Sequence, residues 1–327
     1  MPSPYHNLRL YDSTMLRDYS RCPRYFYFRH VLGWRGAGPF NIKAAFGIAW
    51  SAAMDSLWVH ADIDLAQAAF MEKWNELGQP PEDQVLMAQY PPPHRPSVCR
   101  EMLVHYLRQR EPLFNHPSFK VLTVEKPFAV PLDPNDDTLW YTGRCDKVIE
   151  YEGRVYVVDH KSTGQYSKSK LTGEGGFKWS FLQSFSPNKQ VDGYFHYAHC
   201  VYGDRVDELW IDAALVHKEH HDKFKIIPIK RADATLELWL WETRALIQEI
   251  EAYKRQMQQI VPEDLYMAAF PRDTDACFKF NSQCTYHGPC VMWPNPTGKT
   301  PKEARLVEDR WSPFKDTDQK DVQWLKT

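Results

Sequence analysis

Three residues in the middle of the chain have the types and the spacing that metal-assisted hydrolysis requires. Asp159 and Lys161 lie two positions apart, directly after the apolar run 155–158, and Asp146 lies in the apolar segment before it. Residues two apart in a β-strand point to the same face, so a carboxylate and an ammonium would lie side by side. Two carboxylates can hold a hard divalent cation, and a neighbouring lysine can act on an attacking water.

The segment that must position these residues predicts a β-hairpin. Two runs rich in β-branched and aromatic residues, 139–149 and 154–161, flank the turn pair Glu152-Gly153. A solvated surface hairpin could also carry Asp and Lys as an ordinary pair. The apolar run 155–158 argues against that alternative, because a buried strand seldom ends in charges without a reason.

The register of this hairpin decides whether Asp146 can share a site with Asp159. A two-residue turn pairs Tyr151 with Arg154 and continues the ladder to set Asp146 directly opposite Asp159. A three-residue loop slips the register by one position and sends Asp146 to the other face of the sheet. A shared metal site therefore predicts the two-residue turn, or a bulge that compensates for the slip.

GRCDKV, which contains Asp146, and VVDHKS, which contains Asp159 and Lys161, resemble two consecutive motifs of the PD-(D/E)XK nucleases. The resemblance is to the branch with the RecB and AddB nuclease domains, CRISPR-associated iron-sulfur nucleases and many phage exonucleases, and it extends over residues 10–290. It implies the restriction-endonuclease-like fold of the α/β class, a mixed β-sheet flanked by helices. It also implies Mg²⁺ or Mn²⁺ held by Asp146, Asp159 and the backbone carbonyl of His160, with Lys161 orienting the water.

Further positions of the family pattern fall on other predicted elements. A helix over 186–199, with Ser-Pro at its start, places Gln190 and Tyr194 on one face. They match the family's Q-x-x-x-Y, which implies contact with DNA near the cleaved phosphate. Glu125, in a predicted strand over 121–130, sits where the family often has a glutamate and is a further candidate ligand. Alternatively, it is an exposed strand residue.

The chain departs from the family at the position of a histidine ligand. A buried helix over 44–58 contains Gly47, but Ser51 stands where the family's G-x-x-x-H has its histidine. Asp55 follows one turn later and could approach the metal directly or through water. Alternatively, Ser51 and Asp55 line a polar seam between the helix and the sheet.

Seven cysteines in a chain without a signal peptide argue for thiols or metal ligands rather than a disulfide framework. Three of them cluster in CFKFNSQCTYHGPC, a loop that can wrap a metal, and a fourth precedes Pro23. The resemblance implies that these four hold a [4Fe–4S] cluster that fastens the two ends of the domain together, with Zn²⁺ on the same thiolates as the alternative. The predicted ligands are Cys22, Cys277, Cys284 and Cys290, whereas Cys99, Cys145 and Cys200 are expected to be structural thiols.

The composition is that of a globular protein with no global attraction for nucleic acid. Of the 327 residues, 43% are hydrophobic and 14% aromatic, which is enough for a sizeable core. The net charge is −2, so any DNA site must be a local patch. No run of 18 apolar residues occurs, and the first residues lack the apolar core of a signal peptide. We therefore expect a cytoplasmic protein without a membrane association.

The domain organisation follows from the same patterns. Residues 1–294 are expected to form the nuclease domain, with a helical lobe near 60–115 that carries no chemistry, and 295–327 to form a polar tail. Within the domain, 164–185 interleaves aromatic residues with Lys168, Lys170 and Lys178. Lysines for phosphates and rings for bases suit a single DNA strand. Alternatively, this segment is a solvated flap whose aromatic side chains pack on the core.

These observations favour a divalent-metal-dependent DNA nuclease. We expect an exonuclease that acts on single strands or duplex ends in recombination, repair or phage DNA processing, with a helicase or a recombination protein as partner. The alternative is a non-catalytic DNA-binding or scaffold subunit of a nuclease-helicase complex that retains the fold. Ser51 favours the alternative, whereas Asp146, Asp159 and Lys161 favour the enzyme.

Overall fold

The computed structural model describes residues 7–36, 38, 41–79, 93–169, 173–279, 282–312, 314 and 321–325. The chain divides into two compact units. The central unit comprises Pro39–Pro127 and Arg144–Ala232, and the terminal unit comprises Met1–Gly38, Phe128–Gly143 and Asp233–Thr327. The expected boundary between residues 294 and 295 stays a prediction, and Lys170 lies outside the described residues.

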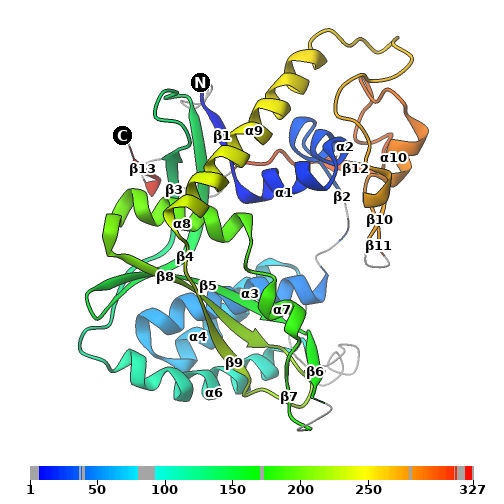
Figure 1. Ribbon diagram of the computed structural model, residues 1–327. Helices are drawn as coiled ribbons and strands as arrows, with labels where there is room; N and C mark the ends of the chain where they lie inside the picture. The colour runs from blue at the N-terminus through cyan, green and yellow to red at the C-terminus, as the bar shows by residue number, and fades with distance from the viewer. Residues whose placement is uncertain are drawn as a thin grey trace. The chain divides into compact units, whose positions relative to one another are not determined.

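A mixed β-sheet is the framework of the fold (Figure 1). Its strand order is β13-β3-β4-β5-β8-β9, and β1 pairs with β4. β4 and β9 are antiparallel to their neighbours β5 and β8, whereas β5 and β8 are parallel to each other. The strands are β1 (Arg9–Tyr11), β3 (Lys120–Pro131), β4 (Leu139–Tyr151), β5 (Arg154–Thr163), β8 (Val206–Leu215), β9 (Phe224–Ile229) and β13 (Gln323–Trp324). The expected α/β fold, a mixed sheet flanked by helices, is confirmed.

The helices of the central unit enclose the apolar side chains of β5 and β8. Figure 1 shows α3, α4 and α6 packed together, with α3 against β5. α3 can pack closely because an added Cβ at Gly47 would lie only 3.1 Å from Ser162 Oγ on β5. The remaining elements of this unit are α3 (Ile42–His60), α4 (Ile63–Glu76), α6 (Pro96–Phe114), β6 (Tyr166–Lys168), β7 (Gly175–Phe177), α7 (Trp179–Gln183), α8 (Lys189–Tyr202) and a 3₁₀ turn (Gly203–Arg205).

One predicted helix start is wrong. α8 begins at Lys189 and not at Ser186-Pro187, because Asn188 is the N-cap. Its side-chain oxygen accepts hydrogen bonds from the backbone N–H groups of Gln190 at 3.0 Å and Val191 at 3.3 Å. Asparagine is among the strongest N-cap residues, and it satisfies donors that the helix itself cannot.

The terminal unit joins the two ends of the chain. β12 pairs with β2, and β13 pairs with Phe128 and Ala129 of β3, so the expected polar tail contains short strands. Its elements are β1, β13, α1 (Ser13–Arg21), α2 (Pro23–Phe26), a π-helical turn (Tyr27–Val31), β2 (Trp34–Gly36), α9 (Asp233–Met257), a 3₁₀ turn (Thr274–Ala276), β10 (Phe278–Lys279), β11 (Ser282–Gln283), α10 (His287–Met292) and β12 (Leu306–Glu308).

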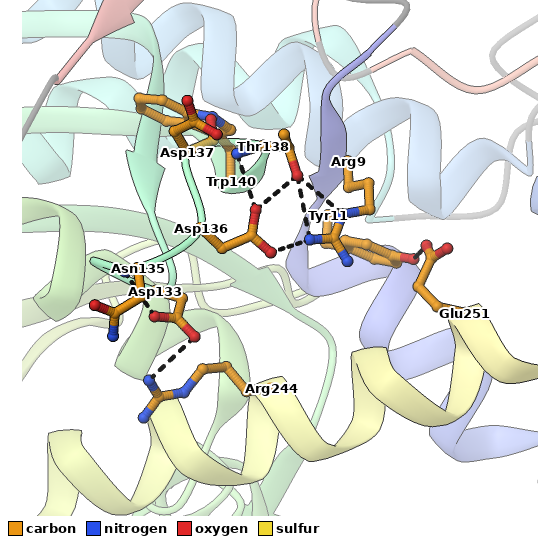
Figure 2. Close-up of polar contacts among 10 residues, drawn as sticks. All are labelled: Arg9, Tyr11, Asp133, Asn135, Asp136, Asp137, Thr138, Trp140, Arg244 and Glu251. Atoms are coloured by element: carbon orange, nitrogen blue, oxygen red, sulfur yellow. Dashed lines mark hydrogen bonds and ion pairs between the residues drawn. The ribbon is translucent and has the colours of Figure 1, made fainter.

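Polar contacts connect β1 to the β3–β4 loop and to α9 in this unit (Figure 2). Arg9 pairs with Asp136 of the loop, and Tyr11 donates a hydrogen bond to Glu251 of α9. The hydroxyl of Thr138 donates to Asp136 at 2.7 Å and is the main reason why the pKa of that carboxyl is lowered. These charged groups are matched by partners, which is typical of a structural contact.

No helix in the described part of the chain is long and apolar enough to span a membrane.

Candidate active site

The hairpin that carries the candidate residues has the two-residue turn. Glu152 and Gly153 have φ angles of 51° and 76°, and positive φ at both central residues is the mark of a type I′ turn. Tyr151 pairs with Arg154 across this turn. The register that can bring the two aspartates together is therefore confirmed, and the three-residue loop is ruled out.

The β4–β5 ladder ends just before the two aspartates. It ends with Lys147 opposite Val158, one position short of Asp146 and Asp159, so the expected regular pairing of these aspartates is wrong. Instead, the Asp146 carboxylate accepts a hydrogen bond of 2.7 Å from the backbone N–H of His160. A side chain thus replaces the ladder here and places the Asp146 carboxylate against the backbone of β5, next to Asp159.

Asp159 and Lys161 form an ion pair at this opening. Lys161 Nζ lies 2.7 Å from one oxygen of Asp159 and 2.9 Å from the other. Asp159 is only 2% exposed, and burial raises the pKa of its carboxyl. The charge of Lys161 opposes this shift, whereas the charge of Asp146 adds to it. Burial works against the charge of Lys161 too, but Asp159 and then Asp146 raise the pKa of Lys161. The lysine therefore remains an ammonium.

Glu125 adds a further carboxylate from β3 of the same unit. Its φ of 46° lies in the left-handed region, which a non-glycine residue occupies at a cost and usually only where the surrounding structure requires it. Burial, followed by the charges of Asp146 and Asp55, raises its pKa to about 8, and Arg144, 3.8 Å away, opposes the shift. A carboxylate with this environment favours a nearby cation.

Asp55 is already held by a buried lysine. Lys147 is fully buried, and its Nζ lies 2.6 Å from Asp55 Oδ1. Burial raises the pKa of Asp55, and Lys147 opposes the shift. Ser51, half-buried, lies one turn earlier on α3. A direct role of Asp55 in metal binding would have to compete with this ion pair.

Gln190 and Tyr194 link α8 to β4. Gln190 Nε2 donates to the Tyr194 hydroxyl at 3.0 Å, and that hydroxyl donates to the backbone carbonyl of Arg144 at 2.8 Å. Arg144 lies two positions before Asp146, so this chain of hydrogen bonds fixes the strand that presents the aspartate. Tyr194 is buried and positions β4, whereas Gln190 is half-buried.

Comparison with known protein families identifies the family of the chain. The sequence model of the PD-(D/E)XK nuclease superfamily matches residues 13–290, which is most of the sequence. The chain belongs to the PD-(D/E)XK nuclease superfamily. Its assignment to the branch of the RecB and AddB nucleases stays a prediction.

Solved structures of distant proteins resemble this superfamily member. A protein from Eubacterium rectale named “Putative exonuclease” is 12% identical, with a TM-score of 0.41, and the match covers 76% of this chain and 84% of that one. The protein SSO0001 is 11% identical, with a TM-score of 0.24, covering 71% and 84%. No curated protein matches the chain. The family assignment therefore rests on the sequence match alone.

A buried polar network behind the site is absent from the sequence-based prediction. Asp212 of β8 lies 2.6 Å from Arg110 Nη2 and 3.1 Å from His160 Nδ1, and it accepts a hydrogen bond from the Tyr106 hydroxyl. Trp58 Nε1 donates to the same hydroxyl at 2.7 Å. Burial alone would raise the pKa of Asp212, but Arg110 and then His160 lower it well below its usual range. The signal was a single charge inside the apolar run LWIDAAL.

The four predicted cysteine ligands meet in the terminal unit. They line one cavity of about 20 Å³, together with Arg21, Arg24 and Arg272. All are free thiols, and burial raises the pKa of two of them, Cys284 and Cys290. Among the described residues, no group of three or more His, Cys, Asp or Glu side chains is arranged to hold a metal ion. The four lining cysteines are Cys22, Cys277, Cys284 and Cys290, whereas Cys99 and Cys145 are buried elsewhere and Cys200 is exposed.

Proposed function

We propose that this superfamily member is a divalent-metal-dependent nuclease that hydrolyses DNA phosphodiesters, as an exonuclease in recombination, repair or phage DNA processing. The observation that carries the proposal is the hydrogen bond that holds the Asp146 carboxylate on the backbone N–H of His160, directly beside the Asp159–Lys161 ion pair. Family membership supports DNA as the substrate. A helicase or a recombination protein would supply the DNA end.

The donor set fits Mg²⁺ or Mn²⁺. Asp146 and Asp159 would hold the ion with the carbonyl of His160, and a further ligand could come from Glu125, Asp55 or Ser51. Mg²⁺ is typically bound through one or two carboxylates, with water and substrate phosphate completing the shell, so three preassembled protein ligands are not required. When bound, the ion polarises the phosphate and lowers the pKa of a bound water.

The chain's own residues would then act on the transition state. Lys161, held by Asp159, donates hydrogen bonds to the attacking water and to the phosphate oxygens as negative charge builds on them. Tyr194 keeps β4 in place through Arg144, and Gln190, beside it, would touch the DNA strand. Residues that act in this way raise the rate more than they raise the affinity for DNA.

A cleavage assay tests the proposal directly. Linear single- and double-stranded DNA should be degraded with Mg²⁺ or Mn²⁺ and left intact with EDTA. Lys161→Ala should lower the cleavage rate by about 100-fold or more and leave DNA binding nearly unchanged. Lys230→Ala, which removes an exposed lysine paired with Asp207, is the matched control and should cleave like the wild type. Absence of cleavage by the wild type with both metals would refute the enzyme.

The second candidate is a DNA-binding or scaffold subunit without turnover. Two observations favour it, namely Ser51 at the family's histidine position and the Lys147–Asp55 ion pair one turn further along α3. Its signature in the same assay is DNA binding that is independent of metal and is not followed by cleavage.

We also propose that the four cysteines of the terminal unit hold a [4Fe–4S] cluster, with Zn²⁺ as the alternative. Four thiols around one cavity supply the donor set of either group, and three arginines in the cavity wall would offset thiolate charge. Protein purified without oxygen should contain iron and acid-labile sulfide. Stoichiometric zinc without iron would identify the alternative. Cys290→Ala should destabilise the protein in both cases, because metal binding contributes to folding.

A further inference from the structure

The segment between β5 and α8 lies in sequence between two parts of the candidate site. It begins after Lys161 and ends before Gln190, and its described residues form the hairpin β6–β7 and the short helix α7 (Figure 1). The sequence leaves open whether its aromatic side chains serve a DNA strand or pack inside the protein. In the structure, some of these aromatic rings are packed and one is exposed.

Most of these rings are packed. Phe177 stacks on Phe181 with ring centroids 5.8 Å apart, and Phe181 meets Phe185 edge-on at 5.1 Å. Phe181 and Phe185 are buried. The ring of Tyr166 lies tilted against that of His217 in the β8–β9 loop, with ring centroids 4.4 Å apart. The phenylalanine contacts pack β7 and α7 against each other, and the Tyr166–His217 contact connects the hairpin to the β8–β9 loop.

Trp179, the first residue of α7, is the exception. It is 72% exposed, although Phe181, two residues later in the same helix, is buried. The backbone beneath it is held on both sides, because Lys178 N–H donates to the carbonyl of Gln165 at 2.8 Å and Phe181 N–H donates to the carbonyl of Lys178 at 3.0 Å. An indole on a fixed backbone loses little conformational freedom when a ligand binds. A base that stacks on the indole would also remove its apolar surface from water, and both effects favour binding.

The position of this indole relative to Lys161 is bounded by chain geometry. Gln165 lies four residues after Lys161 and is hydrogen-bonded to the residue that precedes Trp179. At about 3.5 Å per extended residue, the two side chains start from backbone positions no more than roughly 25 Å apart. At about 3.4 Å per nucleotide of one strand, this upper bound corresponds to about seven nucleotides of DNA. Lys178, exposed beside Trp179, places a positive charge where a phosphate would follow.

We propose that Trp179 and Lys178 form a subsite that binds an unpaired nucleotide of the DNA strand, with the base stacked on the indole and a phosphate on the ammonium. The proposal rests on the proposed nuclease function and gives it a substrate class, namely DNA with a single-stranded segment at the site. A base inside a duplex has both faces covered by its neighbours, whereas an unpaired base offers a face to an aromatic ring.

Binding of a short fluorescent single strand in EDTA tests the subsite without any turnover. Trp179→Ala should weaken binding roughly 5- to 150-fold, the range for loss of one stacked base, whereas Trp179→Phe should retain most of the affinity. The same strand with abasic sites in place of its bases should bind equally to the wild type and to Trp179→Ala. Lys178→Ala should reduce the salt dependence of binding by about 0.7 in the slope of log K against log salt. With Mg²⁺, Trp179→Ala should raise KM and leave kcat nearly unchanged.

Trp241→Ala is the matched control, because Trp241 is a 64% exposed tryptophan on α9 of the terminal unit. It should bind the base-containing strand like the wild type. Equal affinity of the wild type and Trp179→Ala for that strand would overturn the subsite while leaving the nuclease proposal intact. A wild type that cleaves duplex ends but binds no single strand would overturn it too. A wild type that cleaves no DNA at all defeats the proposed function itself.

Discussion

Two buried aspartates on neighbouring strands of the central unit have opposite electrostatic environments. Asp159 of β5 and Asp212 of β8 are each 2% exposed, and Asp212 pairs in register with His160, the residue after Asp159. The pKa of Asp159 is raised by burial, with Asp146 adding to the shift. The pKa of Asp212 is lowered despite burial, because Arg110 and His160 hold its charge.

The difference shows how burial can be separated from function in this protein. Asp212 has a cation and hydrogen-bond donors for its oxygens, so its charge is satisfied by the fold alone. Asp159 shares one lysine with a set of carboxylates whose charges repel each other, and Glu125 has its pKa raised to about 8 in the same surroundings. A charge that the fold leaves unmatched favours an external cation, which is the electrostatic condition of a metal site.

The largest effect is expected for Asp212, the compensated aspartate, whose charge is matched by the fold, whereas Asp159 and Glu125 form the uncompensated side. Asp212→Ala leaves Arg110 buried without its carboxylate, and removal of one partner of a buried ion pair typically costs about 3–5 kcal/mol. Urea denaturation should show this loss in the free energy of unfolding. Asp207→Ala is the control, because its partner Lys230 is exposed, and it should cost less than about 1 kcal/mol. Equal costs for both variants would contradict a structural role for Asp212.

Asp159→Asn should give the opposite result. It should lower the cleavage rate with Mg²⁺ by about 100- to 1000-fold, because a metal ligand and the partner of Lys161 are both lost. The free energy of unfolding should change less than in Asp212→Ala, since relief of the repulsion with Asp146 offsets part of the lost ion pair. Measurement of both quantities on one preparation separates the two aspartates. A loss of stability as large as that of Asp212→Ala would place Asp159 in a structural network.

The compensated aspartate is also the part that sequence patterns did not predict. The hairpin could be predicted from local signals, namely strand composition and a glycine in the turn. Its turn type could be predicted only from the requirement that two ligands share one face of the sheet. The Asp212 network depends on Tyr106 and Arg110 of α6, about a hundred residues earlier in the chain. The helical lobe was expected to carry no chemistry, and an amphipathic pattern does not reveal which of its polar residues turn inward. Likewise, the opening of the ladder at Asp146 depends on a side chain that replaces a backbone partner.

Glu125, on the uncompensated side, should make the free energy of unfolding depend on pH. An unfolded glutamate has a pKa near 4.3, whereas that of folded Glu125 is about 8. Between these values the folded state binds more protons than the unfolded state, so stability falls as pH rises from about 5 to 8. Because its side chain is 36% exposed, we expect a fall of only about 1–2 kcal/mol relative to Glu125→Gln. Urea denaturation at several pH values without metal measures it, and Mg²⁺ should reduce it. Parallel pH profiles for both proteins would show that Glu125 carries no unmatched charge.

The smallest effect is expected when a ligand is added to the uncompensated side. Ser51→His restores the family's residue on α3, one turn before Asp55. A neutral imidazole there would add a nitrogen ligand, but the buried ammonium of Lys147 beside Asp55 opposes a further positive charge. We therefore expect the affinity for Mn²⁺, measured by calorimetry, to rise by about tenfold or less, since imidazole suits Mn²⁺ only moderately. Ser56→His places the same side chain on another face of the same helix, where it should leave the affinity unchanged. If both variants bind Mn²⁺ like the wild type, Ser51 does not face the metal, and the Lys147–Asp55 pair occupies the position that a histidine ligand holds in the family.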